Sequence, residues 1–202
     1  MITIAPPRHY SPAEYLALEE TAESRSEYQN GAIIAMTGGS INHNQIVISL
    51  CLLLRLALKT QPSPVPQKTR VFSSDVRLWI PTYNCYTYPD ILVIQGEPQF
   101  QDDRSDIVMN PILMIEVLSK STRDYDRGEK FKYYRSLPSF AEYLLVDQFQ
   151  MQVDQFRKIK NPKTTEEAWI FQSYDQPTAQ IELSALGIFL GIEDIYEDIV
   201  FE

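Results

Sequence analysis

Tyr88-Pro-Asp-Ile-Leu-Val-Ile94 and Ile112-Leu-Met-Ile-Glu-Val-Leu118 are the two stretches that decide the predicted fold of this chain. Each is an apolar run of strand length, and such runs are typical of strands covered on both faces. Each run also carries one carboxylate, Asp90 in the first and Glu116 in the second. Because an unpaired ionised carboxylate is costly to bury, we expect a cation beside Glu116. Two acids on neighbouring strands could hold a divalent metal ion.

The length and composition predict one globular domain covering residues 1–202. Of the 202 residues, 44% are hydrophobic and 22% are charged, which is ordinary for a folded chain with its own core. The longest apolar run, Ile46 to Leu58, is interrupted by Ser49 and Arg55 and is shorter than the ~20 residues of a membrane span. The first residues do not resemble a signal peptide, and the two cysteines fit neither a disulfide framework nor a zinc site. We therefore expect a cytoplasmic protein with no membrane partner.

The net charge of −9 argues against a protein that coats nucleic acid non-specifically, because such proteins need a basic surface. It does not exclude a nuclease, since acids that hold a metal ion contribute to the negative total. Residues 120–135 form a cationic window that contains Lys120, Arg123, Arg127, Lys130, Lys132 and Arg135.

The order of predicted elements indicates a mixed α/β sheet with helices packed on it. Ser11, Pro12 and Glu14 predict a helix start with a capping box, and Asn30-Gly31 predicts the tight turn of a hairpin. The expected elements are a helix at 11–20, a hairpin at 26–36, a helix at 41–59, a rigid Pro-rich connector at 61–66, strands at 70–80, 90–94 and 111–118, a helix from 121 or 122 to before 138, a strand at 142–146, an antiparallel pair at 151–159 and 169–174, and a short helix at 192–199.

Asp90 and Glu116 are the first candidate metal ligands, and Asp75 is the third. Oxygen ligands suit Mg²⁺ or Mn²⁺, and Mg²⁺ usually takes one or two protein carboxylates together with water and phosphate. Such an ion can polarise a phosphodiester and activate water. Each acid also has a structural interpretation. Asp90 could simply begin a strand, Glu116 could pair with a buried Arg or Lys, and Asp75 could cap a turn or be solvated.

Glu27, His43 and Lys130 are the further candidate catalytic residues. His43 begins a predicted helix, and a helix N-terminus attracts anions such as phosphate. Lys130 shares a helix face with Asp126 and Tyr134, and a cation near the carboxylates could orient water or stabilise a charged transition state. The alternatives are an exposed Glu27, a His43 that belongs to the capping region, and a solvated Lys130.

Several segments resemble a known family. The order helix, three strands, helix, strand, with Pro89-Asp90 and Glu116 on the second and third strands, resembles the PD-(D/E)XK nuclease superfamily of restriction-endonuclease-like fold. More closely, the chain resembles the Uma-two family of restriction endonucleases through Glu27-Tyr28-Gln-Asn-Gly31, Asp75-Val-Arg-Leu, Tyr88-Pro-Asp-Ile, Glu116-Val-Leu-Ser-Lys-Ser-Thr122, Asp126-Arg-Gly-Glu-Lys-Phe131 and Glu142-Tyr-Leu-Leu-Val-Asp147. The resemblance spans nearly the whole chain. It implies a core at about 41–147, an N-terminal helix and hairpin, and a C-terminal β extension.

The chain departs from the superfamily pattern at position 118. The Lys of (D/E)XK would fall there, and this chain has Leu118. The resemblance implies that the following helix supplies the Lys, which points to Lys130, with Lys132 as the substitute. If neither lysine reaches the site, the chain is a non-catalytic relative.

The activity implied by the resemblance is metal-dependent hydrolysis of DNA phosphodiester bonds. Asp90 and Glu116 would hold Mg²⁺ or Mn²⁺ with support from Asp75, Lys130 would position the water, and Glu27 and His43 would line the site. Two alternatives stay open. One is an inactive nuclease-fold module that binds DNA or protein, and the other is a structural homo-oligomer with a buried Glu116–Lys130 ion pair.

A homodimer is also expected, because two-fold symmetry suits cleavage of both strands of a duplex. The late strands carry Phe156, Trp169, Phe171 and Tyr174, and these aromatic side chains could provide an apolar dimer surface.

Overall fold

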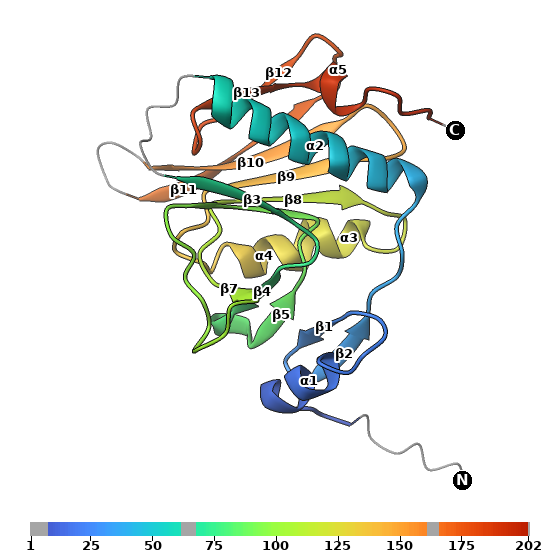
Figure 1. Ribbon diagram of the computed structural model, residues 1–202. Helices are drawn as coiled ribbons and strands as arrows, with labels where there is room; N and C mark the ends of the chain where they lie inside the picture. The colour runs from blue at the N-terminus through green and yellow to red at the C-terminus, as the bar shows by residue number, and fades with distance from the viewer. Residues whose placement is uncertain (1–7, 62–67, 161–165, 202) are drawn as a thin grey trace.

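Two large sheets organise the residues that this computed structural model describes, which are 8–61, 68–160 and 166–201 (Figure 1). The six-stranded sheet contains β3 (Thr69–Ser73), β6 (Ile91–Gln95), β8 (Leu113–Leu118), β9 (Glu142–Asp147), β10 (Val153–Lys160) and β11 (Glu167–Tyr174). The five-stranded sheet contains β1 (Ser26–Gln29), β2 (Ala32–Ala35), β4 (Arg77–Ile80), β5 (Cys85–Thr87) and β7 (Ile107–Val108). A separate two-stranded sheet is formed by β12 (Gln180–Leu183) and β13 (Ile188–Gly191).

Helices cover both faces of the six-stranded sheet (Figure 1). The helical elements are α1 (Pro12–Glu19), α2 (Ile41–Thr60), the 3₁₀-helix η1 (Pro81–Tyr83), α3 (Arg123–Tyr125), the π-helix η2 (Asp126–Lys130), α4 (Phe131–Tyr134) and α5 (Ile192–Ile195). One face carries α2, α5 and the β12–β13 pair, and the other carries α3 and α4. By length and composition α2 could cross a membrane, but Ile46, Leu50 and Leu54 on its inner side belong to the core of the folded chain.

The six-stranded sheet is mixed, as predicted. Its order is β11-β10-β9-β8-β6-β3, in which β8 and β9 are parallel and the other neighbours are antiparallel. Side chains alternate along β8, so that Leu113, Ile115 and Val117 pack in the core beneath α2 while Met114 and Leu118 pack in the second core with α4. The same alternation turns Glu116 toward the face that α3 and α4 cover. The predicted C-terminal β extension is present as β10 and β11.

The N-terminal helix and hairpin form as their sequence signals indicate. The Ser11 hydroxyl accepts a hydrogen bond from the Glu14 amide, and the Glu14 carboxylate accepts one from the Ser11 amide, which completes the capping box of α1. Asn30 and Gly31 both adopt positive φ, at 43° and 102°, as a two-residue hairpin turn requires. The hairpin joins the five-stranded sheet because β1 pairs with β5, at Tyr28 opposite Tyr86.

The predicted strand at 70–80 is wrong, because the chain forms two strands there in two different sheets. β3 pairs with β6 in the six-stranded sheet, whereas β4 pairs with β5 and β7 in the other. A turn separates them, in which the amide of Asp75 donates to the carbonyl of Ser73 at 2.6 Å. Ser and Asp favour such turns, since their side chains compete with the strand hydrogen bonds.

Other boundaries also differ from the prediction. The helix predicted from 121 or 122 is present but begins at Arg123 and passes through the π-helical turn η2 before α4. The predicted terminal helix is shorter, at Ile192–Ile195, and four short strands, β5, β7, β12 and β13, were not predicted. The connector at 61–66 lies outside the described residues apart from Gln61. Among the late aromatic residues, Phe156 and Trp169 pack against the core, while Phe171 is 54% exposed.

A buried acid on β9 makes the stability of the fold depend on pH. Glu142 is fully buried, and burial raises its pKa from 4.5 to about 7 in spite of hydrogen bonds donated by the amides of Ser184 and Ala185. Between these two pH values the folded state keeps a proton that the unfolded state has lost, so the free energy of unfolding falls as the pH rises. The expected loss between pH 4.5 and 7 is about 3 kcal/mol, with no further change above that range.

Urea unfolding of the wild type and of Glu142→Gln from pH 4.5 to 8 measures this loss. The difference in unfolding free energy between the two proteins isolates the Glu142 contribution from that of other titrating groups. We expect the wild type to lose stability relative to the variant as the pH rises to about 7. A difference that does not change with pH would contradict the prediction.

Candidate functional site

Glu116 lies on β8 beneath η2 and α4, and a cation is beside it as the sequence predicted. Its side chain is 3% exposed, and the Lys130 Nζ lies 3.1 Å from its Oε1 atom. The Tyr134 hydroxyl donates a hydrogen bond of 2.6 Å to the same oxygen. The buried carboxylate is therefore compensated by a buried ammonium group and a phenol.

The π-helical turn sets the position of Lys130. Lys130 is the last residue of η2, and its Nζ lies 3.1 Å from Asp126 Oδ1 and 3.7 Å from Glu27 Oε1 in addition to Glu116. π-Helical turns are rare and occur frequently at functional sites. The predicted face of Asp126, Lys130 and Tyr134 is present, and all three side chains meet around Glu116.

The electrostatics of this cluster favour a charged Lys130. Burial acts to lower the pKa of Lys130, but Glu116, Glu27 and Asp126 outweigh it and raise that pKa well above its usual range. Burial raises the pKa of Glu116, and Asp126 and Asp90 add to this effect while Lys130 opposes it. A further cation next to Glu116 would therefore favour its ionised form.

Asp90 stands immediately before β6 and is held next to Glu116. Its Oδ2 accepts a hydrogen bond of 2.8 Å from the amide of Val117 and lies 3.1 Å from His43 Nε2. The amide of Asp90 in turn donates to Glu116 Oε2 at 3.4 Å. Each acid thus accepts a hydrogen bond from a backbone amide of the other's segment, Asp90 from Val117 on β8 and Glu116 from Asp90 just before β6.

His43 reaches this site from the first turn of α2. Ser40 caps the helix by accepting a hydrogen bond of 3.1 Å from the His43 amide. Burial acts to lower the pKa of His43, but its hydrogen bond and charge interaction with Asp90 outweigh burial and raise that pKa. The pair therefore stabilises the protonated imidazole beside the Asp90 carboxylate.

Glu27 comes from β1 in the N-terminal hairpin. Its carboxylate accepts hydrogen bonds from the Thr87 hydroxyl and from the amide of Tyr88 at 3.4 Å, and the Tyr125 hydroxyl lies 3.4 Å from it. These contacts tie β1, the segment before Asp90 and α3 together. The hairpin therefore contributes an acid to the site and also forms one of its walls.

Glu27, His43, Asp90, Glu116 and Lys130 all line one cavity of about 670 Å³. Residues 34–40, which lead from β2 into α2, form one wall, and residues 119–122, which follow β8, form another. The second wall is rich in hydroxyl groups and carries Lys120. Five side chains predicted from separate parts of the sequence are therefore brought together around one space.

The family model described as "Uma2: Putative restriction endonuclease" matches residues 12–191 of this chain. The chain belongs to the Uma2 family. Two similar proteins come from Synechocystis sp. (strain ATCC 27184 / PCC 6803 / Kazusa). "Uncharacterized protein sll1609" is 37% identical over 188 residues, covering 93% of this chain and 100% of the relative. "Uncharacterized protein slr1290" is 32% identical over 197 residues, covering 98% of this chain and 96% of the relative.

A solved structure confirms the fold of this Uma2 chain. It is the crystal structure of "a putative nuclease belonging to DUF820" from Anabaena variabilis ATCC 29413. The TM-score is 0.72 at 20% sequence identity, and the match covers 95% of this chain and 99% of the other. The restriction-endonuclease-like fold predicted from the sequence is thus confirmed.

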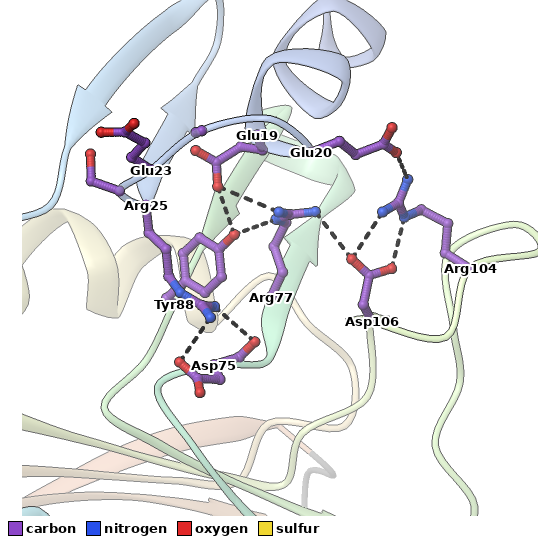
Figure 2. Close-up of a pocket in the computed structure, with 11 residues that line it drawn as sticks. Glu19, Glu20, Glu23, Arg25, Asp75, Arg77, Tyr88, Arg104 and Asp106 are labelled. Carbon is purple, nitrogen blue, oxygen red and sulfur yellow. Dashed lines mark hydrogen bonds and ion pairs between the residues drawn. The ribbon is translucent and has the colours of Figure 1, made fainter.

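Asp75 does not join the other acids of the Uma2 site. Its side chain is 78% exposed and pairs with Arg25 at 3.0 Å. It lines a second cavity, of about 600 Å³, in which Arg25, Arg77 and Arg104 lie among acidic side chains (Figure 2). The turn between β3 and β4 directs Asp75 there, so the structure gives no support to Asp75 as a metal ligand.

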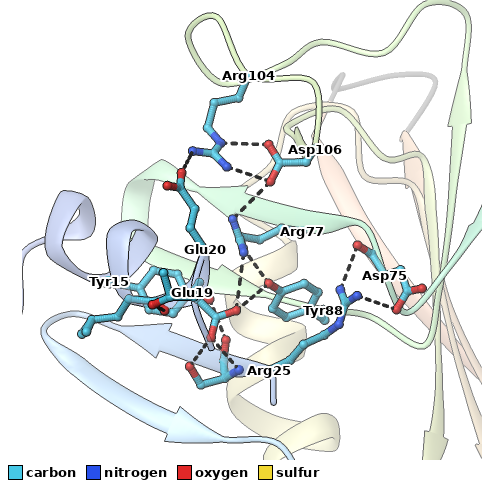
Figure 3. Close-up of polar contacts among 12 residues, drawn as sticks. Tyr15, Glu19, Glu20, Arg25, Asp75, Arg77, Tyr88, Arg104 and Asp106 are labelled. Carbon is cyan, nitrogen blue, oxygen red and sulfur yellow. Dashed lines mark hydrogen bonds and ion pairs between the residues drawn. The ribbon is translucent and has the colours of Figure 1, made fainter. Parts of the chain in front are cut away.

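Tyr88 lines both cavities and connects them. Its hydroxyl accepts a hydrogen bond of 2.7 Å from Arg77 Nε and donates one of 3.0 Å to Glu19 Oε2 (Figure 3). Arg77 also pairs with Glu19 and Asp106 at 3.5 and 3.4 Å. This buried network, which the sequence did not reveal, holds the residue two positions before Asp90. Arg77 and Tyr88 both fall in segments that resemble the family, but no local sequence pattern indicates that Glu19 or Asp106 contacts them.

Lys132 does not line the cavity that contains Asp90, Glu116 and Lys130. Its ammonium group lies 5.5 Å from the centre of the Tyr83 ring, and the residue is exposed. Lys130 is therefore the lysine that reaches Glu116.

The donor set fits a hard divalent cation held by two carboxylates. Within the described ranges, no group of three or more His, Cys, Asp and Glu side chains is arranged to hold a metal ion. Asp90 Oδ1 makes no hydrogen bond to another described residue, and Glu116 Oε2 accepts one long bond from the Asp90 amide. Mg²⁺ commonly binds through one or two protein carboxylates with water and phosphate, so Asp90 and Glu116 suit it.

Proposed function

We propose that this Uma2 chain is a metal-dependent endonuclease that hydrolyses DNA phosphodiester bonds. The convergence of Asp90, Glu116 and Lys130 in one open cavity carries the proposal. Asp90 and Glu116 would hold Mg²⁺ or Mn²⁺, which supplies Lewis-acid polarisation of the phosphate and a lowered pKa for water. Glu27 and His43 line the same space, and a simple buried ion pair of Lys130 with its carboxylates does not require His43.

The residues of the chain prepare the site for attack by water, with no covalent intermediate. Lys130 is cationic and is oriented by Glu27, Glu116 and Asp126, so it can donate hydrogen bonds to the attacking water or to a phosphate oxygen. His43 and the Val117 amide fix one oxygen of Asp90 and leave the other available. Lys120 and the hydroxyl groups at 119–122 are suited to phosphate contacts along the wall.

The alternative of a purely structural ion pair explains less of the geometry. It accounts for Glu116 and Lys130, which are 3.1 Å apart and buried. It does not account for Asp90 and His43, which face the same cavity at 3.1 Å from each other. A catalytic site uses all four residues.

Asp90→Asn is expected to reduce DNA hydrolysis by at least about 10²–10³-fold, because it removes a charge that must balance the metal ion. The measurement is a nuclease assay with Mg²⁺ or Mn²⁺ on supercoiled, linear and single-stranded DNA, with RNA as a further substrate. Binding of Mn²⁺, followed by calorimetry, should weaken in the same variant. Activity on RNA alone would assign a different nucleic acid to the site.

Asp75→Asn is the matched control, since it makes the same chemical change at an exposed acid outside the cavity. It should retain wild-type turnover and Mn²⁺ binding. Equal rates for wild type and Asp90→Asn would refute the assignment of the site. Mn²⁺ binding without hydrolysis of any substrate would favour a binding module.

A further inference from the structure

The outer face of α2 carries a row of exposed aliphatic side chains in the middle of the helix, with polar or charged residues toward both ends. Ile48, Leu52 and Leu56 follow one another at four-residue spacing, which places them on one side of the helix. Their exposed fractions are 56%, 65% and 53%. Large aliphatic side chains at such spacing normally face a partner, and here the sheet already occupies the opposite face of α2.

The apolar surface continues beyond both ends of this row. Ile41 is exposed at the first residue of α2, and Val200 is exposed beside it, where its carbonyl accepts a hydrogen bond of 2.9 Å from Asn42. At the other end of α2, Phe189 is exposed and its backbone is bound by Gln61 through two hydrogen bonds of 2.8 and 3.0 Å. Figure 1 shows α2 against the six-stranded sheet, with β13, α5 and the C-terminal segment along one side of the helix.

The charges that flank this surface differ between its two ends. The C-terminal half of α2 exposes Arg55 and Lys59. α5 packs against α2, and α5 with the following turn exposes Glu193, Glu197 and Asp198. Among the described residues, none of these five side chains takes part in an ion pair within the chain. Two copies in antiparallel orientation would bring basic and acidic ends together, whereas parallel copies would oppose like charges.

We propose that the α2 outer face is the interface of a homodimer in which two α2 helices pack antiparallel about a two-fold axis near Leu52. The helix alone covers about 300 Å² at a length of about 30 Å, less than half of the roughly 800 Å² per partner that stable dimers bury. The flanking segments around Phe189 and Val200 must therefore contribute to it, and each carries an exposed apolar side chain. Each functional cavity remains within one chain, since the two His43 residues would lie about 27 Å apart along the helix axis.

Leu52→Glu tests the interface because it places two like charges at the axis. The side chain is exposed within one chain, so the folded monomer should be retained, as circular dichroism and urea unfolding can verify. At micromolar concentration, we expect light scattering to give a molar mass of twice 23.3 kDa for the wild type and of 23.3 kDa for the variant. This corresponds to a rise of at least about 100-fold in the dimer dissociation constant.

Phe171→Glu is the matched control, since Phe171 is similarly exposed but lies on the late strand β11. It should remain dimeric. Loss of the dimer in Phe171→Glu but not in Leu52→Glu would overturn the proposal and favour the late strands. A monomeric wild type would also overturn the proposal. If that monomer sedimented with phospholipid vesicles and Leu52→Glu did not, the α2 outer face would bind a membrane and not a second copy.

Cysteine cross-linking tests the antiparallel orientation separately. Residues on the two-fold axis face their own copies, so Leu52→Cys should form an intermolecular disulfide under mild oxidation, with the wild type as the background. Ile41→Cys should not, because the two copies of residue 41 would lie about 33 Å apart along the helix axis. Cross-linking of both variants would show parallel helices and contradict the proposed arrangement.

Discussion

Lys130→Ala is expected to slow DNA hydrolysis by about 10²–10⁴-fold. The Lys130 ammonium group lies 3.1 Å from Glu116 and lines the same cavity as Asp90, so its loss removes the cation that would meet the attacking water or the charged phosphate. The measurement is initial rates under saturating Mg²⁺ or Mn²⁺, referred to the folded fraction of each protein by circular dichroism.

Lys132→Ala provides the comparison, because the lysine two residues later in the same helical segment is exposed and contacts Tyr83. It should hydrolyse DNA at close to the wild-type rate. If Lys130→Ala kept full turnover while Lys132→Ala lost it, the role would pass to Lys132. If both variants hydrolysed DNA at the wild-type rate, neither lysine would take part in the mechanism.

Lys130→Met is expected to lower the free energy of unfolding by about 3–5 kcal/mol at neutral pH. The substitution leaves Glu27, Glu116 and Asp126 buried around a neutral side chain, and a buried charge without its partner is strongly destabilising. Burial already raises the pKa of Glu116, and the loss of Lys130, which opposes this effect, would raise that pKa further in the variant. The loss should therefore be largest at neutral pH and should shrink as the pH falls and Glu116 is protonated.

Glu116→Gln separates the roles of charge in stability and in catalysis. Combined with Lys130→Met, it removes one uncompensated carboxylate and should recover part of the lost stability in urea unfolding experiments. By itself it should abolish hydrolysis while leaving Lys130 paired with Glu27 and Asp126. A Glu116→Gln protein with changed stability but unchanged hydrolysis would support the structural ion pair and contradict the nuclease assignment.

The local elements of this protein follow from local chemistry in the sequence. The apolar runs that form β6 and β8, the capping box at Ser11 and the Asn30-Gly31 turn each depend on neighbouring residues, and all appear as predicted. The strand alternation of β8 and the helical spacing of Asp126, Lys130 and Tyr134 also determine which side chains can face each other. For this reason the cation beside Glu116 could be expected before its position was known.

The separation of β3 from β4 could not be predicted in the same way. Both segments show strand-like sequence, and a short polar turn between them does not indicate whether the chain continues along one sheet or enters another. That choice decides the position of Asp75, which faces Arg25 in a separate cavity. The buried contacts of Arg77 with Glu19 and Tyr88 depend on the same choice.

The sequence by itself determined the long helix α2, the buried strands β6, β8 and β9, and the residue types that a divalent-metal site would use. The tertiary structure alone decided which of these residues meet. Glu27 reaches the site because β1 pairs with β5, and His43 reaches Asp90 because α2 begins beside β6. These side-chain contacts depend on the packing of segments that are distant in sequence. Local propensity and spacing carry no information about them, because the pairing of strands and the packing of helices are settled by burial across the whole sheet.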